Sequence, residues 1–168
     1  MKIRLADIVD DSIVDGPGFR MTIFVQGCSR ICPGCHNPGT HDPNGGYDYS
    51  CDEILARAKR NPLLRGLTFS GGEPFMQAEA CSYLAGAAAK TGLDIMTYTG
   101  YTYEELLAGA DSENHWFDLL SNTNILVDGP YDEALRTLDE PFRGSKNQRA
   151  IDVKASLARG EVTLFEFS

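Results

Sequence analysis

Three cysteines are concentrated in the segment that runs from Gln26 to Pro38. Cys28, Cys32 and Cys35 follow a C-x3-C-x2-C spacing within a short loop punctuated by glycine and proline. Thiolates this close in sequence can converge on one inorganic centre, and as soft ligands they suit an iron–sulfur cluster or zinc. Because a [4Fe–4S] cluster normally takes four cysteines and a structural zinc site four ligands, three cysteines leave one position open. We therefore expect an iron–sulfur cluster with one open iron; a zinc site and a chance spacing are the alternatives.

The composition fits a single globular domain that spans residues 1–168. Of the 168 residues, 42% are hydrophobic and 23% are charged, which is ordinary for such a domain. The formal net charge of −9 argues against a nucleic-acid partner, because phosphate contacts need a basic face. We recognise neither a signal peptide nor the roughly 20 consecutive apolar residues that cross a membrane, so no membrane partner is expected. Five cysteines, three of them clustered, favour a metal site in a cytoplasmic location over a secreted disulfide framework.

Short apolar runs alternate with helical patterns along the chain. Strands are predicted at residues 3–8, 20–25, 66–70, 93–98, 124–127, 151–153 and 162–167. Helices are predicted from Ser50 to about residue 61, over residues 77–91, after Thr102 and over residues 115–120, and residues 36–49 are predicted as a loop. Repeated βα units of this kind indicate a largely parallel sheet. Because a complete eight-fold barrel takes about 250 residues, we expect an α/β fold with a partial, open βα barrel and a largely parallel, curled sheet.

A second motif, Gly71-Gly72-Glu73-Pro74, directly follows a predicted strand. Its plainest interpretation is a tight turn between a strand and a helix. The functional interpretation is that the two glycines let the backbone approach a ligand closely, while Glu73 offers an anionic acceptor to an ammonium group. Because sites in α/β sheets form at the carboxyl ends of the strands, we expect this turn and the cysteine loop to lie on the same side of the sheet.

Together these motifs resemble the radical S-adenosylmethionine superfamily. The resemblance rests first on the C-x3-C-x2-C spacing followed by the Gly-Gly-Glu-Pro turn. Asp15-Gly16-Pro17-Gly18-x-Arg20 and Cys35-His36-Asn37-Pro38 narrow it to the glycyl-radical-enzyme activases. Further blocks, at residues 68–75, 98–102, 127–130 and 142–149, are similar to activators of anaerobic ribonucleoside-triphosphate reductase. The resemblance therefore covers nearly the whole chain.

The resemblance implies a [4Fe–4S] cluster held by Cys28, Cys32 and Cys35, with S-adenosyl-L-methionine chelating the fourth iron. One electron from the reduced cluster would break the C5′–S bond, and the 5′-deoxyadenosyl radical would take a Cα hydrogen from one glycine of the partner, anaerobic ribonucleoside-triphosphate reductase. Reduced flavodoxin or a similar carrier is implied as the electron donor. The alternatives are an activase of another glycyl-radical enzyme, such as pyruvate formate-lyase, and a non-catalytic zinc or iron–sulfur interaction module.

The same resemblance implies which residues bind S-adenosyl-L-methionine. The methionine moiety would be lined by Gly71, Gly72 and Glu73, the adenine by the backbone of Gly34, Cys35 and His36, and the other polar groups by Thr99, Gly100 and Asp128. Glu73 is expected near the amino group, and Asp128 near the ribose or the methionine. Gly34 departs from the family pattern, because many relatives have an aromatic or bulky residue there that packs on the adenine.

Several other polar residues have two possible roles each. Arg20 either lines the site or pairs with an acid. Arg143 and Arg149 lie in a basic segment that is either a solvated loop or a contact with the partner or the adenosyl ligand. His41 is expected to be a loop histidine rather than a metal ligand.

Overall fold

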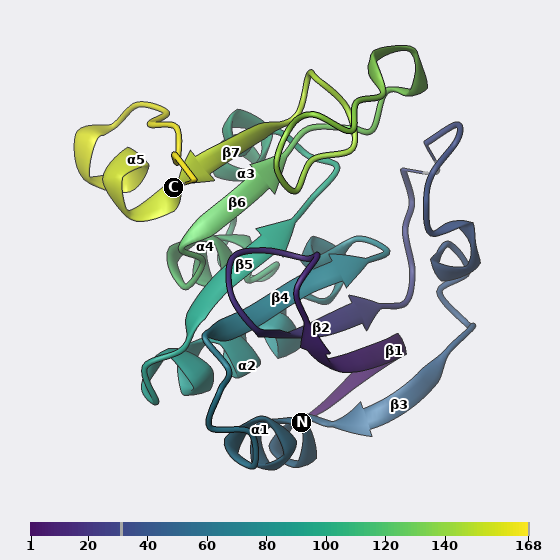
Figure 1. Ribbon diagram of the computed structural model, residues 1–168, viewed down its shortest axis with the longest axis vertical. Helices are drawn as coiled ribbons and strands as arrows, with labels where there is room; N and C mark the ends of the chain where they lie inside the picture. The colour runs from purple at the N-terminus through teal and green to yellow at the C-terminus, as the bar shows by residue number, and fades with distance from the viewer. Residues whose placement is uncertain (31, 168) are drawn as a thin grey trace.

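Within residues 1–30 and 32–167, which the computed structural model describes, seven strands form one open sheet. The strand order is β3-β1-β2-β4-β5-β6-β7, so β3 and β7 are the edges (Figure 1). The strands are β1 (Lys2–Ser12), β2 (Arg20–Val25), β3 (Tyr47–Ser50), β4 (Gly66–Gly71), β5 (Asp94–Tyr98), β6 (Ile125–Asp128) and β7 (Arg149–Asp152). The central strands β2, β4, β5 and β6 are parallel to one another. The predicted α/β fold with an open, largely parallel sheet is confirmed.

Both edges of the sheet depart from the parallel pattern. β1 pairs antiparallel with β2 and with β3, and β7 pairs antiparallel with β6. β3 ends the stretch predicted as a loop, residues 36–49, and it pairs with the start of β1, whose backbone groups would otherwise be unpaired. The strand predicted at residues 162–167 is wrong, because only Leu164 forms a bridge, to Ile151 of β7. Alternating apolar and polar residues also suit a single extended segment, which is what forms here.

The described part of the chain also contains five α-helices and three short 3-10 helices, and the last α-helix follows the last strand. The α-helices are α1 (Cys51–Lys59), α2 (Ala78–Ala89), α3 (Tyr103–Gly109), α4 (Trp116–Ser121) and α5 (Val153–Arg159), and the 3-10 helices are η1 (Pro38–Thr40), η2 (Pro74–Gln77) and η3 (Glu133–Leu135). Ser50 caps α1 by accepting a hydrogen bond from the Glu53 N–H, and Thr102 and Glu105 form a capping box on α3, the helix predicted after Thr102. Across the described residues, no helix is both long and apolar enough to cross a membrane.

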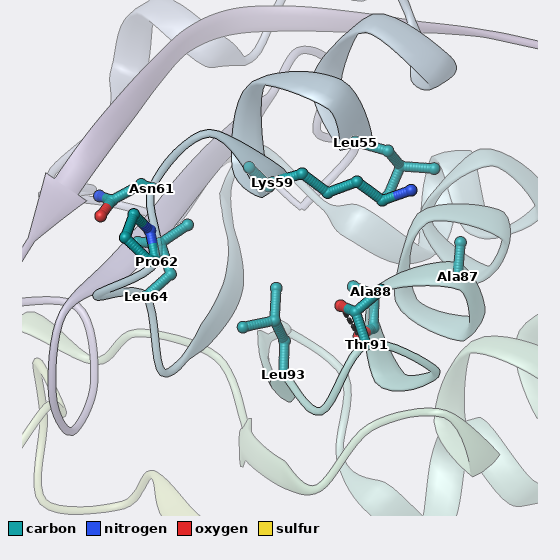
Figure 2. A pocket seen from close by; sticks show the side chains of 10 residues that line it. Leu55, Lys59, Asn61, Pro62, Leu64, Ala87, Ala88, Thr91 and Leu93 are labelled. Carbon is teal, nitrogen blue, oxygen red and sulfur yellow. Dashed lines mark hydrogen bonds between the residues drawn. The ribbon is translucent and has the colours of Figure 1, made fainter.

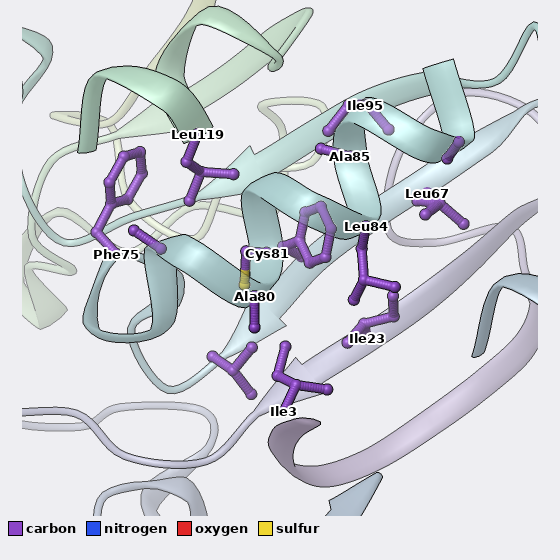
Figure 3. Close-up of a cluster of buried hydrophobic side chains, with 14 of the residues drawn as sticks. Ile3, Ile23, Leu67, Phe75, Ala80, Cys81, Leu84, Ala85, Ile95 and Leu119 are labelled. Carbon is purple, nitrogen blue, oxygen red and sulfur yellow. The ribbon is translucent and has the colours of Figure 1, made fainter. Parts of the chain in front are cut away.

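The hydrophobic core lies between one face of the sheet and the helices packed on it. In Figure 1, α1, α2 and α4 lie behind the sheet. Figure 3 shows side chains of three neighbouring strands, Ile23, Leu67 and Ile95, gathered around Leu84 and Cys81 of α2. This packing occupies one face of the sheet and leaves the other face for the loops at its strand ends.

The segment between β1 and β2, residues 13–19, covers part of that other face. In Figure 1 it is the dark purple connection that crosses in front of the sheet. The contact is close: the Thr68 hydroxyl donates a hydrogen bond to the Asp15 carbonyl at 2.8 Å, and a Cβ on Gly16 would lie 2.7 Å from the sulfur of Met96. Residues 13–19 therefore form a cover over the middle of the sheet.

Arg20, the first residue of β2, fastens this cover to the sheet. Its side chain is fully buried, and its guanidinium donates to the Thr68 hydroxyl at 2.7 Å. It also donates to the carbonyls of Pro17 and Leu67, each at 3.0 Å. An ion pair with Asp94 completes its contacts. Of the two roles considered for Arg20, pairing with an acid is the one observed.

Candidate active site

A cavity of about 680 Å³ opens at the carboxyl ends of the parallel strands. Its lining comes from the cysteine loop, from the turns after β4 and β5, and from the segment after β6, residues 129–148. Volumes of roughly 300–1,000 Å³ are typical of small-molecule and cofactor sites. The predicted site residues that line it are Cys28, Cys32, Cys35, His36, Gly71, Gly72, Glu73, Thr99 and Gly100. Gly34 and Asp128, also within the described chain, lie outside the lining.

A second cavity, of about 270 Å³, lies between α1 and α2, at the opposite ends of the strands (Figure 2). Its walls are mostly apolar and include Leu55, Ala58, Leu64, Ala87, Ala88 and Leu93. Lys59 is the one ionisable side chain among the described residues that line it. The chemistry predicted from the sequence is therefore concentrated in the larger cavity.

The cysteine loop brings three free thiols to one cavity wall. Cys28, Cys32 and Cys35 are all half-buried. The loop is held by hydrogen bonds of 3.1 Å from the Cys28 N–H to the His41 carbonyl and from the Cys35 N–H to the Cys32 carbonyl. The Asn37 N–H donates to Sγ of Cys35 at 3.4 Å, and hydrogen bonds to cysteine sulfur are one of the factors that tune iron–sulfur clusters.

The donor set of this loop, three soft sulfur ligands, suits an iron–sulfur cluster. Among the described residues, no three His, Cys, Asp or Glu side chains surround one point as ligands of a single metal ion. A cluster makes a different demand, because each cysteine binds its own iron. Three thiolates on one wall of a cavity large enough for a cofactor meet that demand.

Gly71 and Gly72 allow the turn after β4 to lie against the end of β2. Gly71 has a φ of +91°, and a Cβ on it would lie 2.7 Å from the backbone of Val25. A Cβ on Gly72 would lie 2.3 Å from the carbonyl oxygen of Gly27, which in turn accepts a hydrogen bond from the Glu73 N–H at 2.8 Å. The glycines were predicted to let a ligand approach, and the close neighbour observed is the strand end that leads into the cysteine loop.

Glu73 joins the turn after β4 to the turn after β5. Its carboxylate is buried, and it accepts hydrogen bonds from the Thr99 hydroxyl at 2.9 Å and from the Gly100 N–H at 2.8 Å. Its other oxygen accepts from the Phe75 N–H at 3.1 Å. Burial raises the pKa of Glu73 to about 7, against the opposing effect of these donors and of Arg30. Because its own chain occupies both oxygens, a contact with the amino group of a ligand stays a prediction.

In wild type, we expect the free energy of unfolding to fall as the pH rises from 5 to 8. Glu73→Gln should remove most of this fall. The Glu73 carboxyl has an ordinary pKa of 4.5 and a pKa of about 7 in the folded chain, so the folded state holds the proton more tightly. The stabilisation is complete below pH 4.5 and is lost as the pH rises through 7, an effect of about 3 kcal/mol. Anaerobic urea unfolding at both pH values measures it, with Glu161→Gln as a surface control. An equal loss in wild type and Glu73→Gln would contradict this pKa.

Asp128 is engaged by its own chain. Its buried carboxylate forms an ion pair with Arg149 and accepts a hydrogen bond from the Tyr103 N–H at 2.8 Å. Arg149 also binds Glu104 at 2.7 Å, and the two acids together raise its pKa. The neighbouring Gly129 lines the cavity instead. A ligand contact by Asp128 stays a prediction, and Arg149 is an internal ion-pair residue rather than a free basic group.

The segment after β6 supports the other side of the cysteine loop. The ring of His36 packs against Tyr131, with 4.8 Å between ring centroids. Gly34 has a φ of +72°, and a Cβ there would lie 2.7 Å from the carboxyl carbon of Glu133. The positive φ, which glycine adopts without strain, is a physical reason for glycine at position 34, where the family pattern has a larger residue.

Part of the cavity wall was not predicted. Lining residues without a predicted site role include Arg30, His41, Tyr131, Phe142 and Gln148. Three of these lie in the irregular segment after β6, where no periodicity indicates which side chains face inward. Arg143, for which a solvated loop and a contact with the partner or the ligand were both considered, lines the cavity and also binds Glu140 at 2.7 Å.

Known proteins are similar in sequence to this chain over most of its length. A family model described as a 4Fe-4S single cluster domain matches residues 14–151. The anaerobic ribonucleoside-triphosphate reductase-activating protein of Escherichia coli (strain K12) is 35% identical over 144 residues, which cover 81% of this chain and 90% of that protein. The protein of the same name from Salmonella typhimurium is 37% identical over the same shares of both chains.

Two other matches are more distant or shorter. The pyruvate formate-lyase-activating enzyme of Clostridium pasteurianum is 35% identical over 117 residues, which cover 64% of this chain and 49% of that enzyme. The crystal structure of QueE from Escherichia coli aligns with a TM-score of 0.49 and 16% identity, over 96% of this chain and 92% of that one. From the family model and the relatives matched over most of their length, the chain belongs to the 4Fe-4S single cluster domain family and, within it, to the anaerobic ribonucleoside-triphosphate reductase-activating proteins.

Proposed function

We propose that this protein is a radical S-adenosylmethionine enzyme that activates an anaerobic ribonucleoside-triphosphate reductase by installing a glycyl radical on it. When bound, a [4Fe–4S] cluster with S-adenosyl-L-methionine supplies the reductive cleavage whose 5′-deoxyadenosyl radical takes a Cα hydrogen from one glycine of the partner. The observation that supports this most is the shared cavity, in which the three cysteine thiols face the turns after β4 and β5. Relatives that cover 81% of the chain are named for this activation.

Each wall of the cavity has its own task in this proposal. Cys28, Cys32 and Cys35 hold the cluster and leave one iron for the substrate. The backbone at residues 71–73 and 99–100 binds the methionine part, and the Glu73 carboxylate keeps these two turns together through its hydrogen bonds. The backbone at residues 34–36 binds the adenine, and Asp128 acts on the ribose or the methionine part.

Stray C–H groups have to be kept from the reacting atoms, because a carbon radical abstracts hydrogen from any C–H group that reaches it. Two covers serve this purpose: residues 13–19 lie over the open face of the sheet, and the segment after β6 packs beside the cysteine loop. Of the second cover, Tyr131, Phe142 and Gly144 line the cavity. In this proposal the partner's glycine enters between the two covers.

The electron and the partner both come from outside this chain. We assign the electron to reduced flavodoxin or a similar carrier, and the activity to the cytoplasm. The formal net charge of −9 offers phosphate groups little attraction, so no nucleic acid is assigned as a partner. Membrane binding is likewise not part of the proposal.

Activation of pyruvate formate-lyase is the second candidate, because one relative with that name is similar to this chain. That similarity extends over 49% of the relative's own length. Offering both purified partners to the same reduced protein separates the two functions. A glycyl radical that forms on pyruvate formate-lyase and not on the reductase would reverse the order of the candidates.

The chemistry itself is tested on protein purified without oxygen. We expect a brown protein with about four irons and four labile sulfides per chain. After reduction in the presence of S-adenosyl-L-methionine, it should release 5′-deoxyadenosine and methionine in equal amounts. A colourless protein with one tightly bound zinc would overturn the radical proposal.

A further inference from the structure

Arg30 lies in the cysteine loop, between Cys28 and Cys32, and the proposed function assigns it no role. Its guanidinium carbon lies 4.7 Å from the centroid of the Tyr101 ring, which is the arrangement of a cation–π interaction. Its Nη1 lies 3.7 Å from Oε2 of Glu105. The side chain also lines the cavity. Arg30 therefore reaches from the segment between two cysteines to the start of α3.

Gly100 and Glu105, which lie next to the Arg30 side chain, leave space for it and hold its charge. A Cβ on Gly100 would lie 2.6 Å from Cδ of Arg30, so the absence of a side chain at position 100 makes room for the arginine stem. Glu105 is held in place by the capping box with Thr102. The acceptor of the ion pair is thus fixed by the first turn of a helix rather than by a flexible loop.

Tyr101 is supported from behind by other side chains. Its ring packs against Trp116, with 4.9 Å between ring centroids. The indole N–H of Trp116 donates to the carbonyl of Phe75 at 3.0 Å, and Phe75 directly follows the Gly-Gly-Glu-Pro turn. Contacts therefore run without interruption from Arg30 to the wall of the cavity after β4.

We propose that Arg30 is a positioning residue of the cysteine loop, and that its fixed positive charge raises the reduction potential of the cluster held there. The inference rests on the proposed function, because it needs that cluster. Arginine stays protonated in proteins, and a cation near a group that gains one electron stabilises the reduced form. The charge around a cluster is one of the factors that set its potential. Tyr101 and Glu105 keep this charge in the cavity wall.

The test is a redox titration of the reconstituted cluster, followed by EPR, in four variants. Arg30→Gln should have a more negative midpoint potential than wild type, and Arg30→Lys, which keeps the charge, should lie between the two. Tyr101→Leu should shift the potential in the same direction as Arg30→Gln, because the guanidinium loses its support. Arg57→Gln is the matched control, since Arg57 pairs with Asp10 on the surface and lines no part of the larger cavity.

Release of iron to a chelator is the second readout, and it tests positioning rather than charge. Tyr101→Leu is expected to release iron about fivefold faster, the factor that corresponds to one cation–π contact at a partly exposed site. Arg57→Gln should release iron at the wild-type rate. Release of iron from Tyr101→Leu at the wild-type rate would overturn the positioning role of Arg30.

The outcomes separate this inference from the proposed function. A wild-type protein that assembles no [4Fe–4S] cluster overturns the proposed function itself. A wild-type protein that cleaves S-adenosyl-L-methionine, together with an Arg30→Gln variant at the wild-type potential, overturns only the role of Arg30. If Arg30→Gln takes up no iron, Tyr101→Leu decides, because it leaves every residue of the cysteine loop in place. An unchanged potential in Tyr101→Leu would then overturn the inference.

Discussion

Cys28→Ser, Cys32→Ser and Cys35→Ser are each expected to lose the iron–sulfur cluster and to reduce cleavage of S-adenosyl-L-methionine to background. All three thiols line one cavity wall, and a serine hydroxyl is a hard, poor ligand for iron in place of a soft thiolate. Each substitution leaves a second iron without a protein ligand. Iron and labile sulfide content after anaerobic reconstitution, with the yield of 5′-deoxyadenosine, measures the effect.

Cys51 and Cys81 are the matched controls for these variants. Both thiols are fully buried in the core, and burial raises the pKa of each. A protonated thiol is a poor metal ligand. Cys51→Ala and Cys81→Ala should therefore keep the wild-type iron content, with a loss of roughly 1 kcal/mol in the free energy of unfolding. Equal loss of iron in these controls and in the serine variants would contradict the assignment of the cluster ligands.

Arg20→Met is expected to lower the free energy of unfolding by about 3–5 kcal/mol. The substitution removes the donor from the carbonyls of Pro17 and Leu67 and leaves Asp94 with Arg65 as its one remaining cation among the described residues. A buried polar group left without its partner costs about 1–3 kcal/mol. Because the same guanidinium holds residues 13–19 over the sheet, their amide hydrogens should also exchange faster. Urea unfolding and hydrogen exchange measure the two effects.

Arg57→Met is the control for Arg20→Met. Arg57 also forms an ion pair, with Asp10, but both side chains are substantially exposed. Surface pairs of this kind contribute about 0–1 kcal/mol, so this variant should be nearly as stable as wild type. If Arg20→Met and Arg57→Met lowered the free energy of unfolding by the same small amount, Arg20 would not be the residue that holds residues 13–19 against the sheet.

The predictions succeeded where a short motif directly follows a buried strand. The run from Arg20 to Val25 leads into the cysteine loop, and β4 leads into the Gly-Gly-Glu-Pro turn. Because parallel strands end at the same side of a sheet, these two local signals were enough to place both motifs around one cavity. The capping box at Thr102 was also predictable, because its contacts lie within four residues of one another.

Features that depend on distant parts of the chain were not predictable. The partner of Asp128 is Arg149, 21 residues away, and nothing local distinguishes an acid that meets an arginine from one that faces a ligand. The antiparallel strand β3 arises because the edge of β1 needs a partner, a requirement that the sequence of residues 47–50 does not express.

The EPR spectrum of the anaerobic reductase after incubation with this protein tests the central claim most directly. The reduced protein, S-adenosyl-L-methionine and the reductase are mixed without oxygen, and a reductase whose target glycine is replaced by alanine serves as the control. We expect a glycyl-radical doublet on the wild-type reductase, none on the control, and none when Cys32→Ser replaces the wild-type activator. Absence of the doublet in samples that do form 5′-deoxyadenosine would contradict the claim that this cavity activates the reductase.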